Sequence, residues 1–248
     1  MNDFQALYAV QDKVLRYLAA DEPLKSIDMV LSGGTGLARG WLHHRYSFDL
    51  YFMVYSEKFI SDSVKVLHAL RPEELGLISI REKHDTLITI EFVNENLKEP
   101  LRIQILEGFF KYGAENRGLL KGFPVDSVRN IFSNKIAAFM DRESPRDLPD
   151  IWAILAKTDG YAVSEIIAEA VPKGVDITTP AFCKKVFNYD FERLSSEVIW
   201  EAEAETDPSS IKGFLFVVAR SLMENGEYKK ESTGPDIDRK STRLNSSH

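Results

Sequence analysis

A glycine-rich turn between a short apolar run and a helix constrains the fold of this chain more than any other feature. Residues 27–31 are apolar and β-like, a Ser-Gly-Gly-Thr turn follows at 32–35, and apolar spacing predicts a helix over 35–44. Glycines let the backbone turn tightly and approach a ligand, and a helix start offers unpaired N–H groups to an anion. The turn lacks the lysine of a P-loop and the third glycine of a dinucleotide fingerprint. It therefore predicts another kind of phosphate-binding loop, with an ordinary structural turn as the alternative.

The spacing of apolar residues changes near residue 124 and divides the chain into two parts. Before this point, helices predicted over 3–20 and 57–70 are interspersed with strand-like runs over 47–55, 77–82, 86–93 and 101–106. After it, every predicted element is a helix: 125–142, 146–157, 163–171, 181–188 and 208–224. The sequence therefore predicts an α+β fold, with a mixed α/β domain over 1–124 and a helical domain over 125–230 packed on it.

Composition places the chain among globular proteins of the cytoplasm. Its 248 residues are 44% apolar and 28% charged, which is enough for a substantial core. No apolar run approaches the roughly 20 residues of a membrane span, and no secretory signal precedes the first helix. A single cysteine, Cys183, excludes an internal disulfide and fits a reducing compartment. The net charge of −7 argues against nucleic-acid binding by bulk charge but leaves room for a local basic cleft.

The last eleven residues have a different origin from the rest of the chain. Residues 238–248, Asp-Arg-Lys-Ser-Thr-Arg-Leu-Asn-Ser-Ser-His, match the in-frame translation of a common sequencing adapter. We therefore expect this stretch to be foreign, which leaves the native C-terminus unknown, and we exclude it from fold reasoning. Without its one acid and three basic residues, the net charge of −7 becomes −9.

Asp49 is the residue that most suggests chemistry. It lies in the run predicted as a strand, between Phe48 and Leu50. An acid among apolar residues needs a compensating partner, and a metal ion held between a phosphate-binding loop and a strand carboxylate supplies one. The alternative is a structural aspartate bonded to nearby His43, His44 or Arg45.

Two sequence blocks make the resemblance to a known family specific. The first is SGGTGLA at 32–38 followed by HRYSFDL at 44–50. The second is KIAA at 135–138, then Arg142, then RDLPD at 146–150. In this order they resemble the patterns GGTAL…HRxSxDxDLF and K[IL]xAxxxR…RDxxDL of the AbiEii/AbiGii nucleotidyl transferase toxin family. The resemblance covers roughly residues 5–225.

The resemblance implies both an activity and a set of site residues. Members of that family look like Mg²⁺-dependent nucleotidyltransferases, and several are bacterial toxins that act on RNA, particularly tRNA, and are paired with an antitoxin protein. It implies transfer of a nucleotidyl group from an NTP to RNA or protein. Asp49 would bind Mg²⁺, and Asp49 and Lys135 would be catalytic. The residues implied to hold the nucleotide are Gly33, Gly34, Thr35, Arg45, Ser47, Asp147 and Asp150.

The second block also has a reading from helix geometry alone. Asp147 and Asp150 lie one turn apart on a predicted helix and share a face. The family pattern suggests that they orient Lys135 or contact the nucleotide, whereas acids at a helix start are also favoured by its dipole. Lys135 itself would neutralise phosphate charge, or be a solvated helix lysine. Arg142 is expected to pair with one of the acids or contact phosphate.

The chain departs from the family at two positions. The family strand carries two acids two residues apart, on one face, where they share two metal ions. Here the second is Tyr51, and a third acid from a neighbouring strand would fall at Gln104. A neutral phenol is a poor Mg²⁺ ligand, and an amide adds no negative charge. Three explanations compete: a catalytically silent nucleotide- or RNA-binding relative, a sequencing error at Tyr51, or a rearranged acid such as Glu91 or Glu107.

Overall fold

The computed structural model describes residues 3–71, 76–142, 144–173, 177–201 and 206–229. The chain forms two compact units. The sheet unit comprises Met1–Gly40, Ser47–Lys111 and Arg117–Asp126, and the helical unit comprises Trp41–Tyr46, Tyr112–Asn116 and Ser127–His248. Two short segments from the first half of the chain thus belong to the helical unit, which a single boundary at residue 124 does not anticipate. The predicted foreign tail over 238–248 lies outside the described residues.

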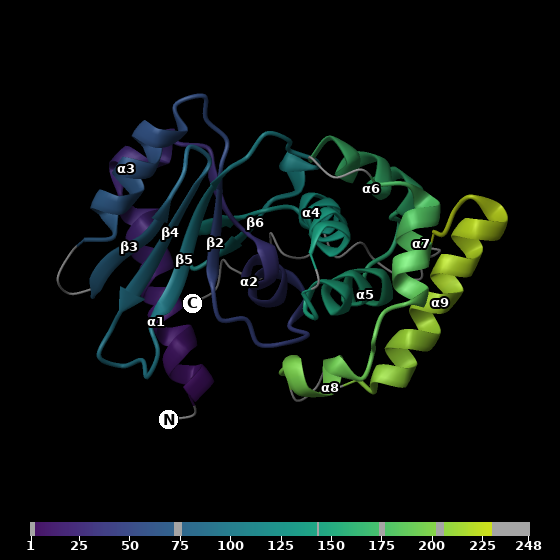
Figure 1. Cartoon of the computed structure of the whole chain (residues 1–248). Helices are drawn as coiled ribbons and strands as arrows, with labels where there is room; N and C mark the ends of the chain where they lie inside the picture. The colour runs from purple at the N-terminus through teal and green to yellow at the C-terminus, as the bar shows by residue number, and fades with distance from the viewer. Residues whose placement is uncertain (1–2, 72–75, 143, 174–176, 202–205, 230–248) are drawn as a thin grey trace. The chain divides into compact units, whose positions relative to one another are not determined.

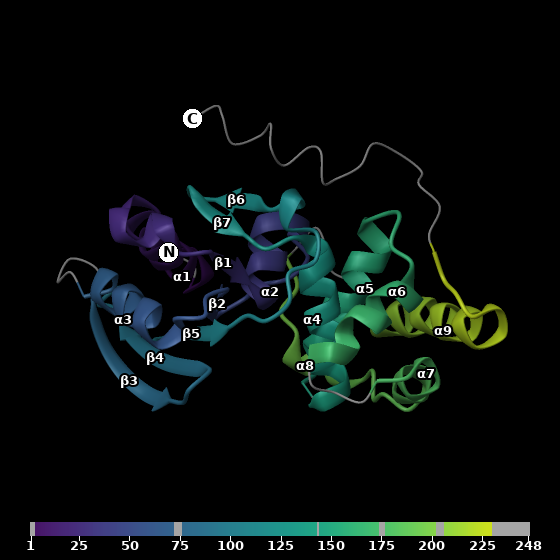
Figure 2. The ribbon, with the colours of Figure 1, turned by 90° about the horizontal axis from the view of Figure 1, so that it is seen from above.

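The sheet unit is built on a seven-stranded mixed sheet with the strand order β3-β4-β5-β2-β1-β7-β6 (Figures 1 and 2). β2 runs parallel to β5, and β1 runs parallel to β7, whereas the other neighbouring strands are antiparallel. This confirms the predicted mixed α/β fold. The strands are Met29–Ser32 (β1), Leu50–Val54 (β2), Leu77–Lys83 (β3), Leu87–Val93 (β4), Leu101–Glu107 (β5), Gly118–Leu120 (β6) and Phe123–Val125 (β7).

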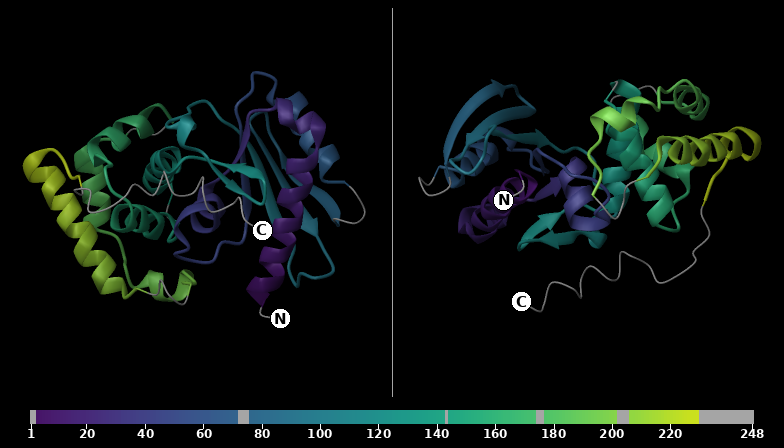
Figure 3. Two further views of the ribbon diagram at one scale, coloured as in Figure 1. Left: turned by 180° about the vertical axis from the view of Figure 1, so that it is seen from behind. Right: turned by 90° about the horizontal axis from the view of Figure 1, so that it is seen from below.

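One face of this sheet carries the core of the unit. Leu50, Phe52 and Val54 of β2 are fully buried, whereas the residues between them are only half-buried, as period-2 alternation requires. The helices α1 (Asp3–Ala20) and α3 (Phe59–Ala69) belong to this unit, and α1 runs across the sheet in Figure 3. A short 3₁₀ turn, Glu22–Ser26, joins α1 to the sheet. The opposite face of the sheet carries the half-buried residues, which are therefore available to line a binding site.

The glycine turn is itself the start of the helix, which corrects the predicted boundary. α2 spans Gly33–Leu37 and continues as a π-helical turn over Ala38–Leu42. Gly33 has a φ of +66°, which only glycine adopts without strain. The placement of Asp49 within a strand was also wrong by one residue, because β2 begins at Leu50. Asp49 lies at the entrance to the strand, where no sheet pairing fixes it.

Three short elements were not predicted. β6 and β7 have three residues each, which is too short for an alternating pattern to emerge. Their turn uses Lys121 and Gly122, both with positive φ, but lysine is not a residue that signals such a turn. The third is α8, Arg193–Glu197, a helix of five residues.

The helical unit follows the predicted pattern with shifted ends (Figure 1). α4 packs against α5 and α6, and α7 packs against α9. Ser127, Thr178 and Asp207 cap α4, α7 and α9, each accepting a backbone N–H with its side chain. No helix in the described part of the chain is long and apolar enough to cross a membrane. The bounds are Val128–Asp141 (α4), Asp147–Lys157 (α5), Val163–Ala170 (α6), Thr179–Phe187 (α7) and Pro208–Asn225 (α9), with 3₁₀ turns at Ala114–Asn116 and Val171–Lys173.

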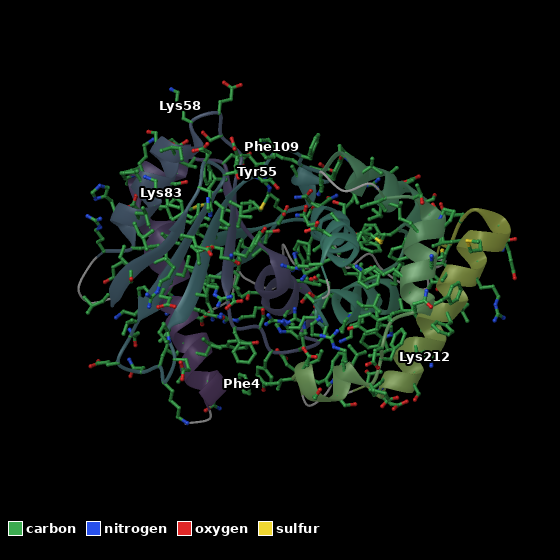
Figure 4. All side chains as sticks on the ribbon, viewed as in Figure 1. Phe4, Tyr55, Lys58, Lys83, Phe109 and Lys212 are labelled. Atoms are coloured by element: carbon green, nitrogen blue, oxygen red, sulfur yellow. The ribbon has the colours of Figure 1, made fainter. Side chains whose placement is uncertain are left out.

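Truncating Phe52 should destabilise the protein far more than the same truncation at the surface. Phe52 is fully buried and meets the ring of Phe123 edge-on at 5.3 Å, whereas Phe109, labelled in Figure 4, is 69% exposed. We expect Phe52→Ala to lower the free energy of unfolding by about 3–5 kcal/mol. Phe109→Ala is the matched control and should change it by less than about 0.5 kcal/mol. Urea denaturation of the two variants tests this, and equal effects would contradict the assigned core.

Candidate functional site

The glycine turn lies directly beside Tyr51. Ser32 of β1 pairs with Tyr51 of β2, so the turn that follows β1 begins next to this tyrosine. A Cβ atom added to Gly33 would lie 3.2 Å from the Tyr51 Cβ, which is tighter than ordinary contact. Glycine is therefore required at 33 both by the positive φ and by the neighbouring ring. Gly33 and Gly34 are half-buried, so their backbone N–H groups remain within reach of a ligand.

Thr35 holds the glycine turn to the segment that precedes β2. Its side chain is buried, and its hydroxyl donates to the carbonyl oxygen of Asp49 and lies 2.8 Å from the hydroxyl of Ser47. Ser47 is also buried. Both residues were predicted to contact the nucleotide, but the structure gives their hydroxyls to each other and to the backbone. Their part in this arrangement is to fix the position of Asp49 relative to the turn.

Gln11 is a residue of this arrangement that sequence reasoning missed. Its amide donates to the carbonyl oxygens of Ser47, at 3.2 Å, and Phe48, at 2.9 Å, while Arg39 donates to its amide oxygen at 3.0 Å. Gln11 is fully buried on the apolar face of α1. A polar residue in register with Leu18 on that face was the available signal, because a buried amide needs partners.

Asp49 is the carboxylate that the sheet unit presents at this turn. Its side chain is half-buried, and within the described residues its oxygens have no hydrogen-bond or ion-pair partner in the structure. The alternative of a structural aspartate bonded to His43, His44 or Arg45 is wrong: His44 and Arg45 bind Asp150 instead, and no bond joins His43 to Asp49 among the described residues. Asp49 therefore keeps its charge available for a cation.

Tyr51 and Gln104 are neighbours in a row of polar side chains that crosses the sheet. The parallel register of β2 and β5 pairs Tyr51 with Gln104, and the antiparallel register of β5 and β4 pairs Gln104 with Thr89. The Gln104 amide lies 3.5 Å from the Thr89 hydroxyl, which in turn lies 3.2 Å from a carboxylate oxygen of Glu82. Acids at 51 and 104 would thus be adjacent on one face, and the chain has a phenol and an amide there.

The two acids considered as substitutes lie elsewhere in the sheet. Glu91 pairs with Arg102 across β4 and β5 and forms an ion pair with Arg81. Glu107 pairs with Val54 at the far end of β2. Neither is a sheet neighbour of Tyr51, so neither replaces the missing second acid in place.

Asp126 is an acid near the turn that the sequence did not reveal. It follows β7, and its carboxylate accepts a hydrogen bond of 2.8 Å from the hydroxyl of Ser32, the residue before Gly33. Its own N–H donates to the carbonyl oxygen of Leu31 at 2.9 Å. The carboxyl ends of β1 and β7 meet here because the two strands are parallel. Asp126 is buried, so it fixes the end of β1 rather than facing a ligand.

The donors in the sheet unit fit one magnesium ion but not two. No group of three His, Cys, Asp or Glu side chains that could hold a metal ion occurs in the described ranges of the chain. Mg²⁺ is commonly bound by one or two carboxylates together with substrate phosphates, and Asp49 meets that minimum. A two-metal site needs a second acid at 51 or 104, and the chain has none there.

A second cluster lies entirely within the helical unit and centres on Asp150 of α5. Its carboxylate oxygens lie 2.7 and 2.8 Å from the Nε and Nη2 atoms of Arg45. They also lie 2.8 Å from the Nε2 atom of His44 and 2.7 Å from the Nζ atom of Lys135. Asp150 and His44 are fully buried and Arg45 nearly so. The segment that carries His44 and Arg45 is held by Tyr46, whose N–H donates to the carbonyl oxygen of Ile199 at 2.8 Å.

Asp147 completes this cluster one helical turn earlier. Its carboxylate lies 2.8 Å from the Nζ atom of Lys135 and 2.9 Å from the Nε atom of Arg142. Lys135 is thus held between two carboxylates, as one reading of the sequence predicted, and Arg142 pairs with an acid, also as predicted. Two of the three ammonium protons of Lys135 are engaged by the carboxylates, and its side chain is buried as well.

The cluster controls the protonation of its own members. Burial by itself would raise the pKa of Asp150, but the charges of Arg45 and Lys135 and their hydrogen bonds outweigh it and hold that pKa well below its usual range. The same balance, with Lys135 and Arg142, lowers the pKa of Asp147. Burial lowers the pKa of His44 despite its bond to Asp150, so the imidazole is neutral. Because an ionised carboxylate only accepts, the His44 proton lies on Nε2.

The structure thus groups the predicted site residues into two sets. Gly33, Gly34, Thr35, Ser47 and Asp49 come together in the sheet unit. The other four, Arg45, Lys135, Asp147 and Asp150, come together in the helical unit. Arg45, Asp147 and Asp150 bind one another's charges and are buried, so they position Lys135 instead of projecting toward a nucleotide.

The comparison with known families gives the class of protein to which the strand order, the glycine turn and the acid that follows it belong. A family model described as "Nucleotidyl transferase AbiEii toxin, Type IV TA system" matches residues 16–205, and this chain belongs to that toxin–antitoxin family. No curated protein matches the sequence.

Two solved structures from Helicobacter pylori share the fold. The protein JHP933 has a TM-score of 0.56 and 18% identity, over 91% of this chain and 94% of that chain. A protein described as a "putative nucleotidyltransferase" has a TM-score of 0.59 and 18% identity, over 91% of this chain and 96% of that chain. At this identity the likeness shows the fold alone.

Neutralising Asp150 should unfold the protein at much lower denaturant concentrations. Asp150→Asn keeps the shape but leaves the buried charges of Arg45 and Lys135 without their main partner. We expect the free energy of unfolding to fall by about 3–5 kcal/mol. The exposed Asp190→Asn is the matched control and should change it little. A loss below about 1 kcal/mol in urea denaturation would show that the cluster does not depend on this charge.

His44 should make stability depend on pH in mildly acidic solution. Its pKa is lowered by folding, so its contribution is complete above the unfolded value of about 6.5 and is lost as the pH falls through the folded pKa. The slope from this one proton is at most about 1.4 kcal/mol per pH unit. Below about pH 4, the lowered pKa values of Asp147 and Asp150 add a further loss.

The measurement is the unfolding free energy of the wild type and two variants as a function of pH. His44→Gln still donates to Asp150 but does not titrate, so the loss that begins near pH 6.5 should disappear. His68→Gln changes an exposed histidine of α3 and should keep the wild-type profile. Identical profiles for the two variants would rule out His44 as the source.

Proposed function

We propose that this protein binds an NTP and transfers its nucleotidyl group to RNA, with tRNA as the acceptor class. The observation that carries the proposal is the Asp49 carboxylate, which has no partner within the described residues and is fixed by Thr35 beside an accessible glycine turn. Membership in the AbiEii toxin family supports the NTP substrate and an antitoxin protein as partner.

Each residue has a defined part in this reaction. The backbone N–H groups of Gly33 and Gly34 hold phosphate oxygens. The dipole of α2 adds little to this binding, because the helix has only five residues. Asp49 holds Mg²⁺, which supplies neutralisation of the triphosphate charge when it is bound. Within the helical unit, Asp147 and Asp150 hold the ammonium group of Lys135 in place.

The proposed step transfers the nucleotidyl group from the NTP to a hydroxyl group of the acceptor. The oxygen of the acceptor hydroxyl forms a bond to the α-phosphorus of the NTP, and the bond from that phosphorus to the β-phosphate oxygen breaks. Pyrophosphate leaves with the electron pair of the broken bond. The hydroxyl proton is lost to water. The protein contributes positioning and charge stabilisation, which dominate catalysis of phosphoryl-type transfers.

A second candidate function is supported by the polar row in the sheet. Tyr51 and Gln104 are adjacent on one face, at the two positions where the family pattern places acids. The same loop would then bind an NTP or RNA without transferring anything. The two candidate functions predict different effects on RNA labelling when a carboxylate is introduced at position 51.

A label-transfer assay separates the two functions. The protein is incubated with Mg²⁺, total tRNA and each radiolabelled NTP in turn. If the enzyme proposal holds, the wild type labels RNA and Asp49→Asn reduces the rate by about 10²–10³-fold. The charge-matched control is Asp85→Asn, an exposed acid in the turn between β3 and β4, and it should label RNA at the wild-type rate.

The variant Tyr51→Asp gives the contrasting outcome. If the wild type binds NTP without labelling RNA and Tyr51→Asp labels it, the chain is a silent relative that lost one acid. If the wild type neither labels RNA nor binds an NTP in equilibrium dialysis, both functions are contradicted. Resequencing codon 51 from an intact clone establishes which residue the native protein carries.

A further inference from the structure

We propose that Gln11 of α1 is a positioning residue for metal binding, because it couples the helix that starts at the glycine turn to the segment that carries Asp49. This role rests on the function proposed above, in which Asp49 holds Mg²⁺ beside the phosphates of an NTP. Gln11 is fully buried, so it acts through the residues it binds rather than through contact with the metal or the nucleotide. The partners of its amide group all belong to the sheet unit.

The segment from Ser47 to Asp49 is held by side chains rather than by the pairing of strands. It belongs to no helix or strand, since β2 begins one residue later. The N–H of Ser47 donates to the hydroxyl of Tyr8 at 3.4 Å, and the carbonyl oxygen of Asp49 accepts from the hydroxyl of Thr35. The position of Asp49 therefore depends on side chains that come from α1 and α2.

Gln11 supplies the two hydrogen bonds in the middle of this segment. Its amide nitrogen donates to the carbonyl oxygen of Ser47 at 3.2 Å and to that of Phe48 at 2.9 Å. Both amide protons are used, which fixes the plane of the amide group. Tyr8 lies three residues earlier on the same face of α1, so this one face holds three backbone atoms of the segment.

The other end of the same amide binds the helix that follows the glycine turn. Arg39 lies in the π-helical turn Ala38–Leu42, which continues α2, and it donates to the amide oxygen of Gln11 at 3.0 Å. Its guanidinium group also lies 4.1 Å from the centre of the Tyr8 ring and 2.5 Å from a carboxylate oxygen of Asp12. One side chain thus connects the phosphate-binding turn to the metal ligand.

These contacts need an amide at position 11. Glutamine carries two donors and an acceptor on one planar group, whereas an ionised glutamate only accepts. In Gln11→Glu, the carboxylate keeps the bond to Arg39 but repels the carbonyl oxygens of Ser47 and Phe48. This variant therefore releases the segment before β2 and leaves the helix after the glycine turn attached to α1.

A partner that orients a metal ligand affects the affinity for the metal without touching it. Loss of such a partner typically costs about 10–100-fold in metal affinity. Asp49 is especially sensitive to its position, because Tyr51 and Gln104 provide no second acid that could hold the ion after a shift. Binding of the metal should thus depend on Gln11, whereas binding of phosphate by the glycine turn should not.

The test measures how much a metal ion contributes to the binding of each of the four NTPs by the full-length protein. Electron paramagnetic resonance gives the affinity for the Mn²⁺ complex of the NTP, and equilibrium dialysis in EDTA gives the affinity for the NTP alone. Gln11→Glu is compared with Gln5→Glu, which makes the same change at an exposed position of α1. Asp49→Asn reports on the metal ligand itself, and circular dichroism shows whether each variant is folded.

We expect Gln11→Glu to lower the ratio of the two affinities roughly tenfold and to leave the affinity for the metal-free NTP unchanged. Gln5→Glu should match the wild type. A negative charge added at position 11 would by itself favour a cation, so charge does not explain a loss. Tyr8→Phe is the second variant in case Gln11→Glu does not fold. It removes the hydroxyl that binds Ser47 and should lower the ratio about threefold.

The variants distinguish failure of this inference from failure of the proposed function. If Asp49→Asn lowers the ratio and Gln11→Glu does not, the metal site stands and the role of Gln11 is rejected. Equal losses of both affinities in Gln11→Glu also reject it, because they indicate a general effect on the fold. If Asp49→Asn leaves the ratio unchanged, or if no NTP binds, both proposals fail. None of these titrations contains an acceptor, so the outcome is the same whether or not the chain transfers a nucleotidyl group.

Discussion

The carboxylate of Asp150 is the group on which the rest of the helical unit depends. A buried charge is tolerated only with close partners, and Arg45, His44 and Lys135 supply them within 2.8 Å. This one anion draws the segment before β2, the middle of α4 and the start of α5 together. His44 and Arg45 of the first sequence block and the charged residues of the second block therefore belong to a single ion-pair network, which is a physical reason for these parts of the two blocks to occur together.

Several of the sequence predictions had a clear physical basis. Helical and alternating spacing located most elements, because burial of one face determines both patterns. The one-turn separation of Asp147 and Asp150 was enough to predict that these two acids share a face, and the family resemblance suggested that they orient Lys135. It was not enough to predict Arg45 as their partner, because a residue between a helix and a strand has no periodicity to indicate where its side chain points. Arg45 was consequently assigned to the nucleotide rather than to Asp150.

Other features escaped prediction because they depend on strand pairing. The contact between Asp126 and Ser32 exists only because the three-residue strand β7 runs parallel to β1. Gly33 had to be a glycine for its φ and for the ring of Tyr51, and this second reason requires the register of β1 and β2. By contrast, the departure at Tyr51 and Gln104 was visible in the sequence through the family resemblance, and the parallel register of β2 and β5 then shows that the two residues are paired.

The neutral pair at 51 and 104 affects catalysis and binding in opposite directions. A second and third carboxylate beside the glycine turn would repel a triphosphate until metal ions compensated for their charge. With a phenol and an amide there, Asp49 is left as the acid at the entrance of β2, and the backbone N–H groups of the turn meet less opposing charge. In the proposed function, binding of the NTP would therefore be lost less readily than its transfer, because transfer relies on the acids that positions 51 and 104 lack.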